Sequence, residues 1–144
     1  MKTLLSGFPV TVKQPLQWGE MDMHNHVNNV WFFRYIENAR IAYYEKINKY
    51  EFEKKTGISF ILASATCQYL SPLTYPDTVI AGAQITTIDK DCAIIGYRLV
   101  SNKNKRLAAK AQTTIVSYDF TKNKKVLFPV ELKRRIMKLE NKTF

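Results

Sequence analysis

The sequence predicts an α+β fold in which a curled antiparallel sheet of about five strands wraps a long central helix. Residues 28–48 are apolar on nearly every face of a helix, so this helix needs cover on all sides. One strand-like run precedes it and four follow it, and the links between those four are short. Short links favour antiparallel neighbours over crossover connections.

Length and composition indicate one globular domain over residues 1–144, because 46% of the 144 residues are hydrophobic and 24% are charged. No apolar run is long enough to cross a bilayer, so we expect no membrane association. The N-terminal stretch "MKTLLSGFPV" has too short an apolar segment for a signal peptide. We therefore expect a cytoplasmic protein.

The first predicted strand covers Phe8–Trp18, and Pro15 confines it to a sheet edge or a bulge. The central helix follows over Asn28–Asn48. Its apolar stripe recurs at steps of four, three, four and four residues: Phe32, Ile36, Ala39, Tyr43 and Ile47. Apolar residues beside the stripe leave little polar face, which predicts a helix buried on nearly all sides.

Four strands are predicted in the second half: Ile58–Leu70, Thr78–Ile88, Ala93–Ser101 and Arg106–Tyr118. The stretches "SPLTYPD", "DKDC" and "NKNK" link them, and their shortness predicts a meander of successive neighbours. A short basic helix, "VELKRRIMKLE", follows Pro129. Its apolar positions are Val130, Leu132, Ile136 and Leu139.

The net charge of +10, from 22 Lys and Arg against 12 Asp and Glu, predicts an anionic partner. The basic residues fall in turns and helix ends, without the aromatic-studded basic strand of an RNA-binding module, so we expect no nucleic acid. Cys67 and Cys92 are far apart and form no CxxC, which favours plain buried thiols.

The stretch "WGEMDMHNHVNN" gathers both histidines and two carboxylates just before the central helix. Glu20, Asp22, His24 and His26 match no common zinc spacing, so we expect no metal. Asn at the helix entrance is typical of an N-terminal cap. A helix N-terminus also offers unpaired N–H groups and partial positive charge, as an oxyanion requires.

The segment "WGEMDMHNHVNNVWFFRYIENAR" resembles the signature of hotdog-fold acyl-CoA thioesterases of the hydroxybenzoyl-CoA thioesterase type. The residues that fit the pattern are Asp22, His26, Val27, Asn28, Asn29, Phe32, Tyr35, Glu37, Ala39 and Arg40. The later "SPLTYPDTV" and "LFPVEL" are also similar to the family, so the resemblance covers nearly the whole chain. Asn25 stands where the family often has Gly, and Asn tolerates the left-handed conformation better than most residues.

The resemblance implies a carboxylate at the second acidic loop position, Asp22, as general base or nucleophile, and no GxSxG offers a serine instead. Glu20 is interpreted as a solvated loop carboxylate. Glu37 is the rival base, although its spacing to Arg40 favours a structural ion pair. The predicted site residues are Asp22, Asn29 and His26 for catalysis, and Asn28, Val27 and Phe32 for substrate binding.

The implied reaction converts acyl-CoA and water to a free acid and CoA, without a cofactor, and the CoA phosphates account for the basic surplus. Two alternatives stay open: an acidic acyl carrier protein in place of CoA, or an acyl-CoA-binding module without catalysis. Unpaired strands at the edges of so small a sheet predict a homodimer or homotetramer. Pairing two edges across a two-fold axis would make one continuous sheet.

Overall fold

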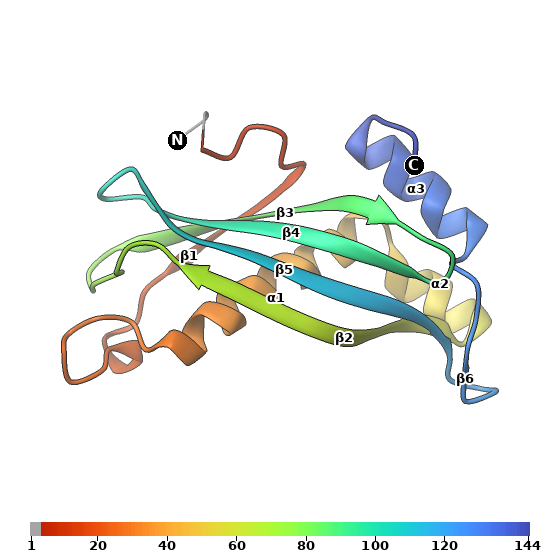
Figure 1. Cartoon of the computed structure of the whole chain (residues 1–144), viewed down its shortest axis with the longest axis horizontal. Helices are drawn as coiled ribbons and strands as arrows, with labels where there is room; N and C mark the ends of the chain where they lie inside the picture. The colour runs from red at the N-terminus through yellow and green to blue at the C-terminus, as the bar shows by residue number, and fades with distance from the viewer. Residues whose placement is uncertain (1–3) are drawn as a thin grey trace.

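A computed structural model describes residues 4–144, and it has the predicted α+β architecture of a curled sheet with one long helix across it (Figure 1). The strands are β1 Val10–Pro15, β2 Ile58–Tyr69, β3 Thr78–Ile88, β4 Cys92–Ser101, β5 Arg106–Asp119 and β6 Lys124–Lys125. The helices are α1 Asn29–Lys46, α2 Lys49–Thr56 and α3 Val130–Glu140, with a 3-10 turn at Trp18–Glu20. Within residues 4–144, no helix is long and apolar enough to span a bilayer.

The four later strands lie within one residue of their predicted bounds at each end, but the predicted neighbours are partly wrong. The order is β1-β3-β4-β5-β2, so only β3, β4 and β5 form a meander. β2 pairs with β5, from Ile58 opposite Asp119 to Tyr69 opposite Ala109. The link after β2 is long enough to pass β5 and β4, a move of three strand spacings, and enter the sheet at β3. The length of this link therefore could not distinguish a hairpin between β2 and β3 from a crossing over the sheet.

The predicted helix over residues 28–48 corresponds to α1, which ends two residues earlier, and the chain turns at Asn48 into a second helix. Asn48 adopts a left-handed conformation with φ of 53°, which ends α1 and starts α2 at the next residue. The prediction missed α2, whose sequence "KYEFEKKT" was interpreted as a basic turn region. The first strand is also shorter than predicted, because β1 ends at Pro15 before the 3-10 turn.

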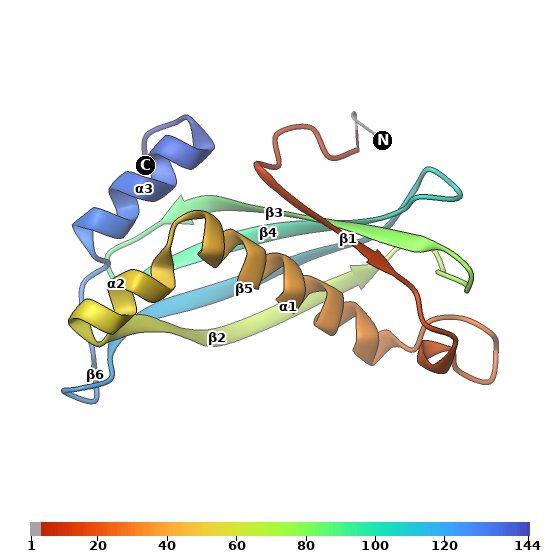
Figure 2. The same cartoon turned by 180° about the vertical axis from the view of Figure 1, so that it is seen from behind.

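Helix α1 lies across the concave face of the sheet, over β1, β3 and β4 (Figure 2). Its predicted stripe is buried, including Tyr43, which is fully inaccessible. Burial on all sides was wrong, however, since Val30 is 68% and Phe33 is 39% exposed. The helix is displaced toward β1, and a cavity of about 360 Å³ remains on its other side, against Leu62 and Ala65 of β2.

The two long edges of the sheet differ in how they are protected. β1 is a short edge strand that ends in Pro15, as predicted, and beyond it α3 packs against β3. The Glu140 carboxylate of α3 accepts hydrogen bonds from Ile85 N at 2.8 Å and Tyr43 Oη at 2.6 Å. On α3, Leu132 and Ile136 are buried as predicted and Leu139 is partly buried. Val130, the first residue of α3, is exposed.

Candidate active site

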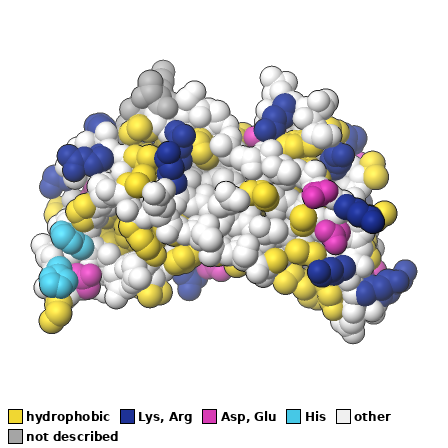
Figure 3. All heavy atoms as spheres, in the orientation of Figure 1, with side chains coloured by type: hydrophobic (Ala, Val, Ile, Leu, Met, Phe, Trp, Pro, Cys, Tyr) yellow, Lys and Arg dark blue, Asp and Glu magenta, His cyan; other side chains and the backbone are white. Residues whose placement is uncertain are grey.

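The loop before α1 is a tight hairpin. Met21 and Val27 form an isolated antiparallel bridge, and Asp22 N donates to His26 O at 2.8 Å. At its tip Asn25 has a φ of 61°, the left-handed conformation expected at the position where the family often has Gly. Met23 beside it is 92% exposed. The hairpin therefore projects Asp22 and both histidines at one end of the molecule, where Figure 3 shows the imidazoles beside an acidic side chain.

The Asp22 carboxylate is exposed and held by the hairpin backbone. Its Oδ1 accepts hydrogen bonds from His24 N at 2.8 Å and from His26 N at 3.3 Å. The bond from His24 N has the largest effect and lowers the Asp22 pKa. Desolvation opposes it, and the bond from His26 N and the two imidazoles lower the pKa further. No described residue donates a hydrogen bond to Oδ2. Asp22 thus offers an ionised oxygen to a ligand.

The start of α1 is a capped helix N-terminus with one amide left without a partner among residues 4–144. Asn28 is the N-cap, and its side-chain oxygen accepts from Val30 N at 3.1 Å, as expected of a cap. Asn28 N donates to Glu20 O at 2.9 Å. Asn29 N, the first helical amide, donates to no other residue within 4–144. This amide and the positive end of the helix dipole can stabilise an oxyanion.

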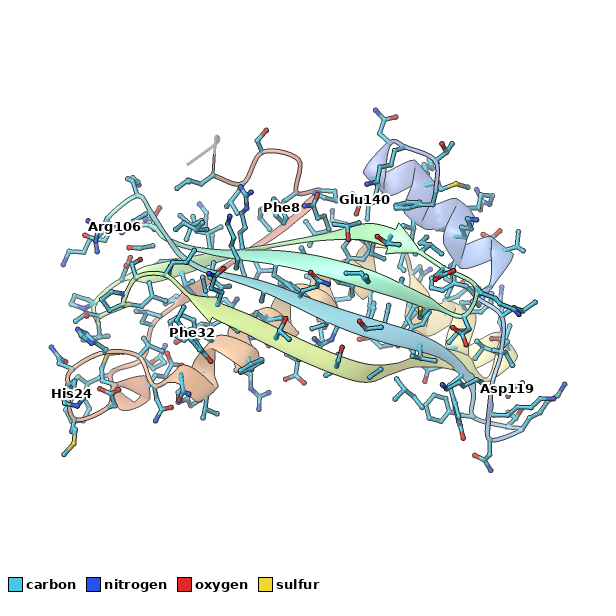
Figure 4. All side chains as sticks on the ribbon, in the orientation of Figure 1. Phe8, His24, Phe32, Arg106, Asp119 and Glu140 are labelled. Carbon is cyan, nitrogen blue, oxygen red and sulfur yellow. The ribbon has the colours of Figure 1, made fainter. Side chains whose placement is uncertain are left out.

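All six predicted site residues line one cavity of about 440 Å³ at the start of α1. They are Asp22, His26, Val27, Asn28, Asn29 and Phe32. Val27 and Phe32 are mostly core side chains that reach the cavity with a small part of their surface, and Figure 4 places Phe32 beneath the sheet near the hairpin. Proximity supports the predicted grouping and leaves each residue's role a prediction.

The other wall of the cavity comes from the end of β2 and the turn that follows it, a segment that was not among the predicted site residues. Its residues are Tyr69, Leu70, Ser71 and Pro72. The Tyr69 hydroxyl donates to Asn29 O at 3.4 Å, and its ring meets Phe32 edge-on with centroids 5.0 Å apart. The stretch "YLSPL" overlaps the "SPLTYPDTV" segment that resembles the family, which could have pointed to it. Residue spacing alone could not show that it lies beside the start of the central helix.

The interpretation of Glu20 as a solvated carboxylate was wrong, because it is 8% exposed. Its Oε1 accepts from the Tyr35 hydroxyl at 2.6 Å and from Gln17 N at 3.0 Å. Burial and the hydrogen bond to Glu20 raise the Tyr35 pKa far above its ordinary range. Glu20 therefore links the loop to α1 through Tyr35. A buried tyrosine hydroxyl needs a hydrogen-bond partner, and this requirement could have predicted that Glu20 is buried.

Glu37 forms the predicted ion pair with Arg40, at 4.0 Å, and a closer one with Arg34 at 2.9 Å. It lines the cavity between α1 and β2, apart from the Asp22 cavity. Within the described part of the chain, no three His, Cys, Asp or Glu side chains gather as a metal site requires. Cys67 and Cys92 are free and half-buried.

The fold and the residues at the start of α1 define the class as a hotdog-fold thioester hydrolase. The chain belongs to the thioesterase-like superfamily, whose family profile matches residues 16–136. The hydroxybenzoyl-CoA type within that superfamily remains a resemblance.

A Thermus thermophilus thioesterase solved with coenzyme A and zinc is 27% identical, has a TM-score of 0.85, and is matched over 96% of this chain and 99% of its own. The long-chain acyl-CoA thioesterase FadM of Escherichia coli is 21% identical over 81% of this chain and 88% of its own length. The uncharacterized protein YsmA of Bacillus subtilis is 40% identical over 58 residues, which is 40% of this chain and 38% of YsmA.

Proposed function

We propose that this chain is one domain that hydrolyses acyl-CoA to a free acid and CoA. The observation that carries the proposal is a single cavity that joins an ionised carboxylate, Asp22, to the open amide at the start of α1. Similarity to a thioesterase solved with coenzyme A, and to a long-chain acyl-CoA thioesterase, supports CoA as the carrier.

Asp22 acts in this proposal as the nucleophile. An Asp22 oxygen attacks the thioester carbonyl carbon, and Asn29 N with the helix dipole stabilises the oxyanion. The C–S bond then breaks, CoA leaves as a thiolate that takes a proton from water, and an acyl-aspartate anhydride remains. Water hydrolyses the anhydride. A lowered pKa keeps the carboxylate ionised, as attack on the thioester carbonyl requires.

A single turnover in H2(18)O tests this step. Attack by Asp22 predicts one 18O atom in the Asp22 side chain after digestion and mass spectrometry, provided that water attacks the aspartyl carbonyl of the anhydride. In repeated turnovers the label reaches the carboxylate whenever that carbonyl is attacked. An unlabelled Asp22 after many turnovers, together with no acyl-enzyme trapped by hydroxylamine, would show water as the direct nucleophile, with Asp22 as base.

The proposed active form is a homodimer paired through β2. Within residues 4–144, β2 pairs only with β5, so its other edge is open, and most of its side chains are exposed. The apolar groove beside it is lined by Val30, Trp31, Phe33 and Leu62. A second copy of β2 would pair the free backbone groups and cover this groove.

Sedimentation at assay concentration tests the assembly, with a dimer or tetramer expected. A fully active species near 16.7 kDa would exclude it. Thiol release from acyl-CoAs of graded chain length, beside an acyl-carrier-protein thioester, tests the substrate. Activity on the carrier-protein thioester alone would show that acyl carrier protein, and not CoA, is the carrier. Activity on neither thioester would favour a binding module without catalysis.

A further inference from the structure

Two charged side chains of α1, Glu37 and Arg40, line the groove of about 360 Å³ between α1 and β2. The walls of this groove are otherwise mainly apolar, and include Val30, Phe33 and Leu62. The Arg40 side chain is only 12% exposed, so its guanidinium is largely withdrawn from water. A charged group in such a position needs hydrogen-bond partners.

The partners that the protein gives Arg40 are few and distant. Its Nη1 donates to the Tyr97 hydroxyl at 3.4 Å, and that hydroxyl already shares a hydrogen bond of 2.8 Å with Thr113 Oγ1. Its Nη2 lies 4.0 Å from Glu37 Oε2, which is too far for a hydrogen bond. Within residues 4–144, no other residue accepts a hydrogen bond from Arg40. Most of its N–H donors can therefore serve a ligand in the groove.

Glu37 supplies the complementary acceptor. Its Oε1 accepts from Arg34 Nη1 at 2.9 Å, whereas its Oε2 accepts no hydrogen bond within the described chain. A hydroxyl group fits the 4.0 Å gap between Oε2 and Arg40 Nη2, because one oxygen can donate to the carboxylate and accept from the guanidinium. A ligand carboxylate would be repelled by Glu37, and an alkyl end would leave both charges desolvated without a partner.

The groove continues the Asp22 cavity along one seam. Asn29 of α1 and the end of β2 line the Asp22 cavity, whereas Val30 of α1 and the middle of β2 line the groove. Figure 2 shows that α1 and β2 run in opposite directions, so both walls lead away from the Asp22 cavity together. An acyl chain whose thioester lies at Asn29 can therefore extend along the apolar groove toward Glu37 and Arg40.

The distance along α1 sets where a hydroxyl must lie on the acyl chain. Glu37 and Arg40 follow Asn29 by eight and eleven residues, which is about 12 and 17 Å along the helix. An extended acyl chain advances about 1.3 Å per carbon, so roughly ten to twelve carbons separate the thioester carbonyl from this pair. A benzoyl group is too short to reach it.

We infer that Glu37 and Arg40 select acyl-CoA substrates whose chain carries a hydroxyl group at its far end, as in an ω-hydroxyacyl-CoA of medium length. The inference rests on the proposed function and dimer, since a second copy of β2 would close the groove around the hydroxyl. Arg40 donates to that hydroxyl and Glu37 accepts from it, and neither touches the thioester. The pair therefore determines specificity and takes no part in the chemical step.

Matched substrates test the selection. Wild type should have a kcat/KM for ω-hydroxydodecanoyl-CoA about tenfold above that for dodecanoyl-CoA, as expected of one charge-assisted hydrogen bond. Arg40→Met, which keeps a long side chain but no donor, should reduce this ratio to about one. Glu37→Gln keeps an acceptor oxygen and should retain part of the preference. A ratio near one in wild type would overturn the inference.

Arg34→Met is the matched control. It makes the same change on the same helix and removes the ion pair to Glu37 Oε1, but it keeps Oε2 and Arg40. The preference of this control for the hydroxylated chain should stay as in wild type. An equal loss of preference in Arg34→Met and Arg40→Met would assign the effect to the overall charge of the groove and count against the inference.

A contact between Arg40 and the second copy of the chain is the competing explanation. Arg40→Met would then weaken the dimer in sedimentation and leave the ratio of the two kcat/KM values as in wild type. That result would overturn the inference, whereas a lost ratio in an intact dimer would support it.

Direct binding separates failure of this inference from failure of the proposed function. Calorimetry with thioether analogues of the two CoA esters, which cannot be hydrolysed, measures recognition without turnover. Tighter binding of the hydroxylated analogue by wild type, but not by Arg40→Met, would support the inference even if no thioester is hydrolysed. Equal binding of the two analogues by wild type would reject it, whatever the activity.

Discussion

Glu20 and Asp22 are two carboxylates two residues apart, and the fold gives them opposite environments. Glu20 points into the protein, where the Tyr35 hydroxyl and Gln17 N use its Oε1. Asp22 points outward, with its bonds to the hairpin backbone confined to Oδ1. The comparison shows that an acidic pair in a loop is not one functional unit. Glu20 is a structural hydrogen-bond acceptor, whereas Asp22 is available to a ligand.

The largest effect is expected from removing the available carboxylate. Asp22→Asn should lower kcat/KM by at least about 100-fold, because an amide is neither nucleophile nor base, and should leave the melting temperature unchanged. Thiol release and a thermal melt measure the two quantities. Near wild-type turnover would move the catalytic role to another group, with Glu37 the first to test.

The pH profile sharpens the same comparison. Because hydrogen bonds from the hairpin amides hold the Asp22 pKa below its ordinary value of 3.8, activity that needs ionised Asp22 is fully present above that value. Activity should be lost as pH falls through the lowered pKa, about tenfold for each pH unit below it. An acid limb of kcat/KM near pH 6, in protein shown to be folded by circular dichroism, would indicate an imidazole instead.

For the buried partner the expected effect is on stability. Glu20→Gln should lower the free energy of unfolding by about 1–2 kcal/mol, since the amide oxygen keeps neutral hydrogen bonds in place of charge-assisted ones. Turnover should change only a few-fold. Urea titration measures the first and thiol release the second. If Glu20→Gln lost as much turnover as Asp22→Asn and kept its stability, Glu20 would have a catalytic and not a structural role.

The smallest effects concern the hairpin tip. Asn25→Ala should cost roughly 1 kcal/mol, because alanine is disfavoured at the positive φ of this position, whereas Asn25→Gly should remain within a few tenths. Activity of the glycine variant should match wild type. Melting temperatures of the pair give the comparison, and equal values would mean that the turn relaxes to another conformation.

Local patterns in the sequence were enough to predict much of the fold. A strand-like run between two turn segments located β3 at its exact bounds, and apolar spacing located the buried stripe of α1. Asn28 was recognisable as a cap from its place before the helix. Each of these features depends on residues close together in the chain.

Features set by distant residues could not be predicted. The pairing of β2 with β5 joins Tyr69 to Ala109, and nothing near either residue specifies the other. The burial of Glu20 depends on Tyr35, and the Asp22 cavity needs the end of β2 as its second wall. The sequence therefore predicted which residues form the start of the site and left its opposite wall open.

The unequal edges of the sheet limit how far an assembly can grow. At one edge, β1 is short and ends in Pro15, and the Glu140 carboxylate of α3 accepts a hydrogen bond from Ile85 N of β3. This edge therefore has few free backbone groups for a further strand. Among residues 4–144 the β2 edge is the one left open, and in the proposed dimer its pairing with itself would use it up. Sheet pairing in that dimer would stop at two copies and could not propagate into a fibre.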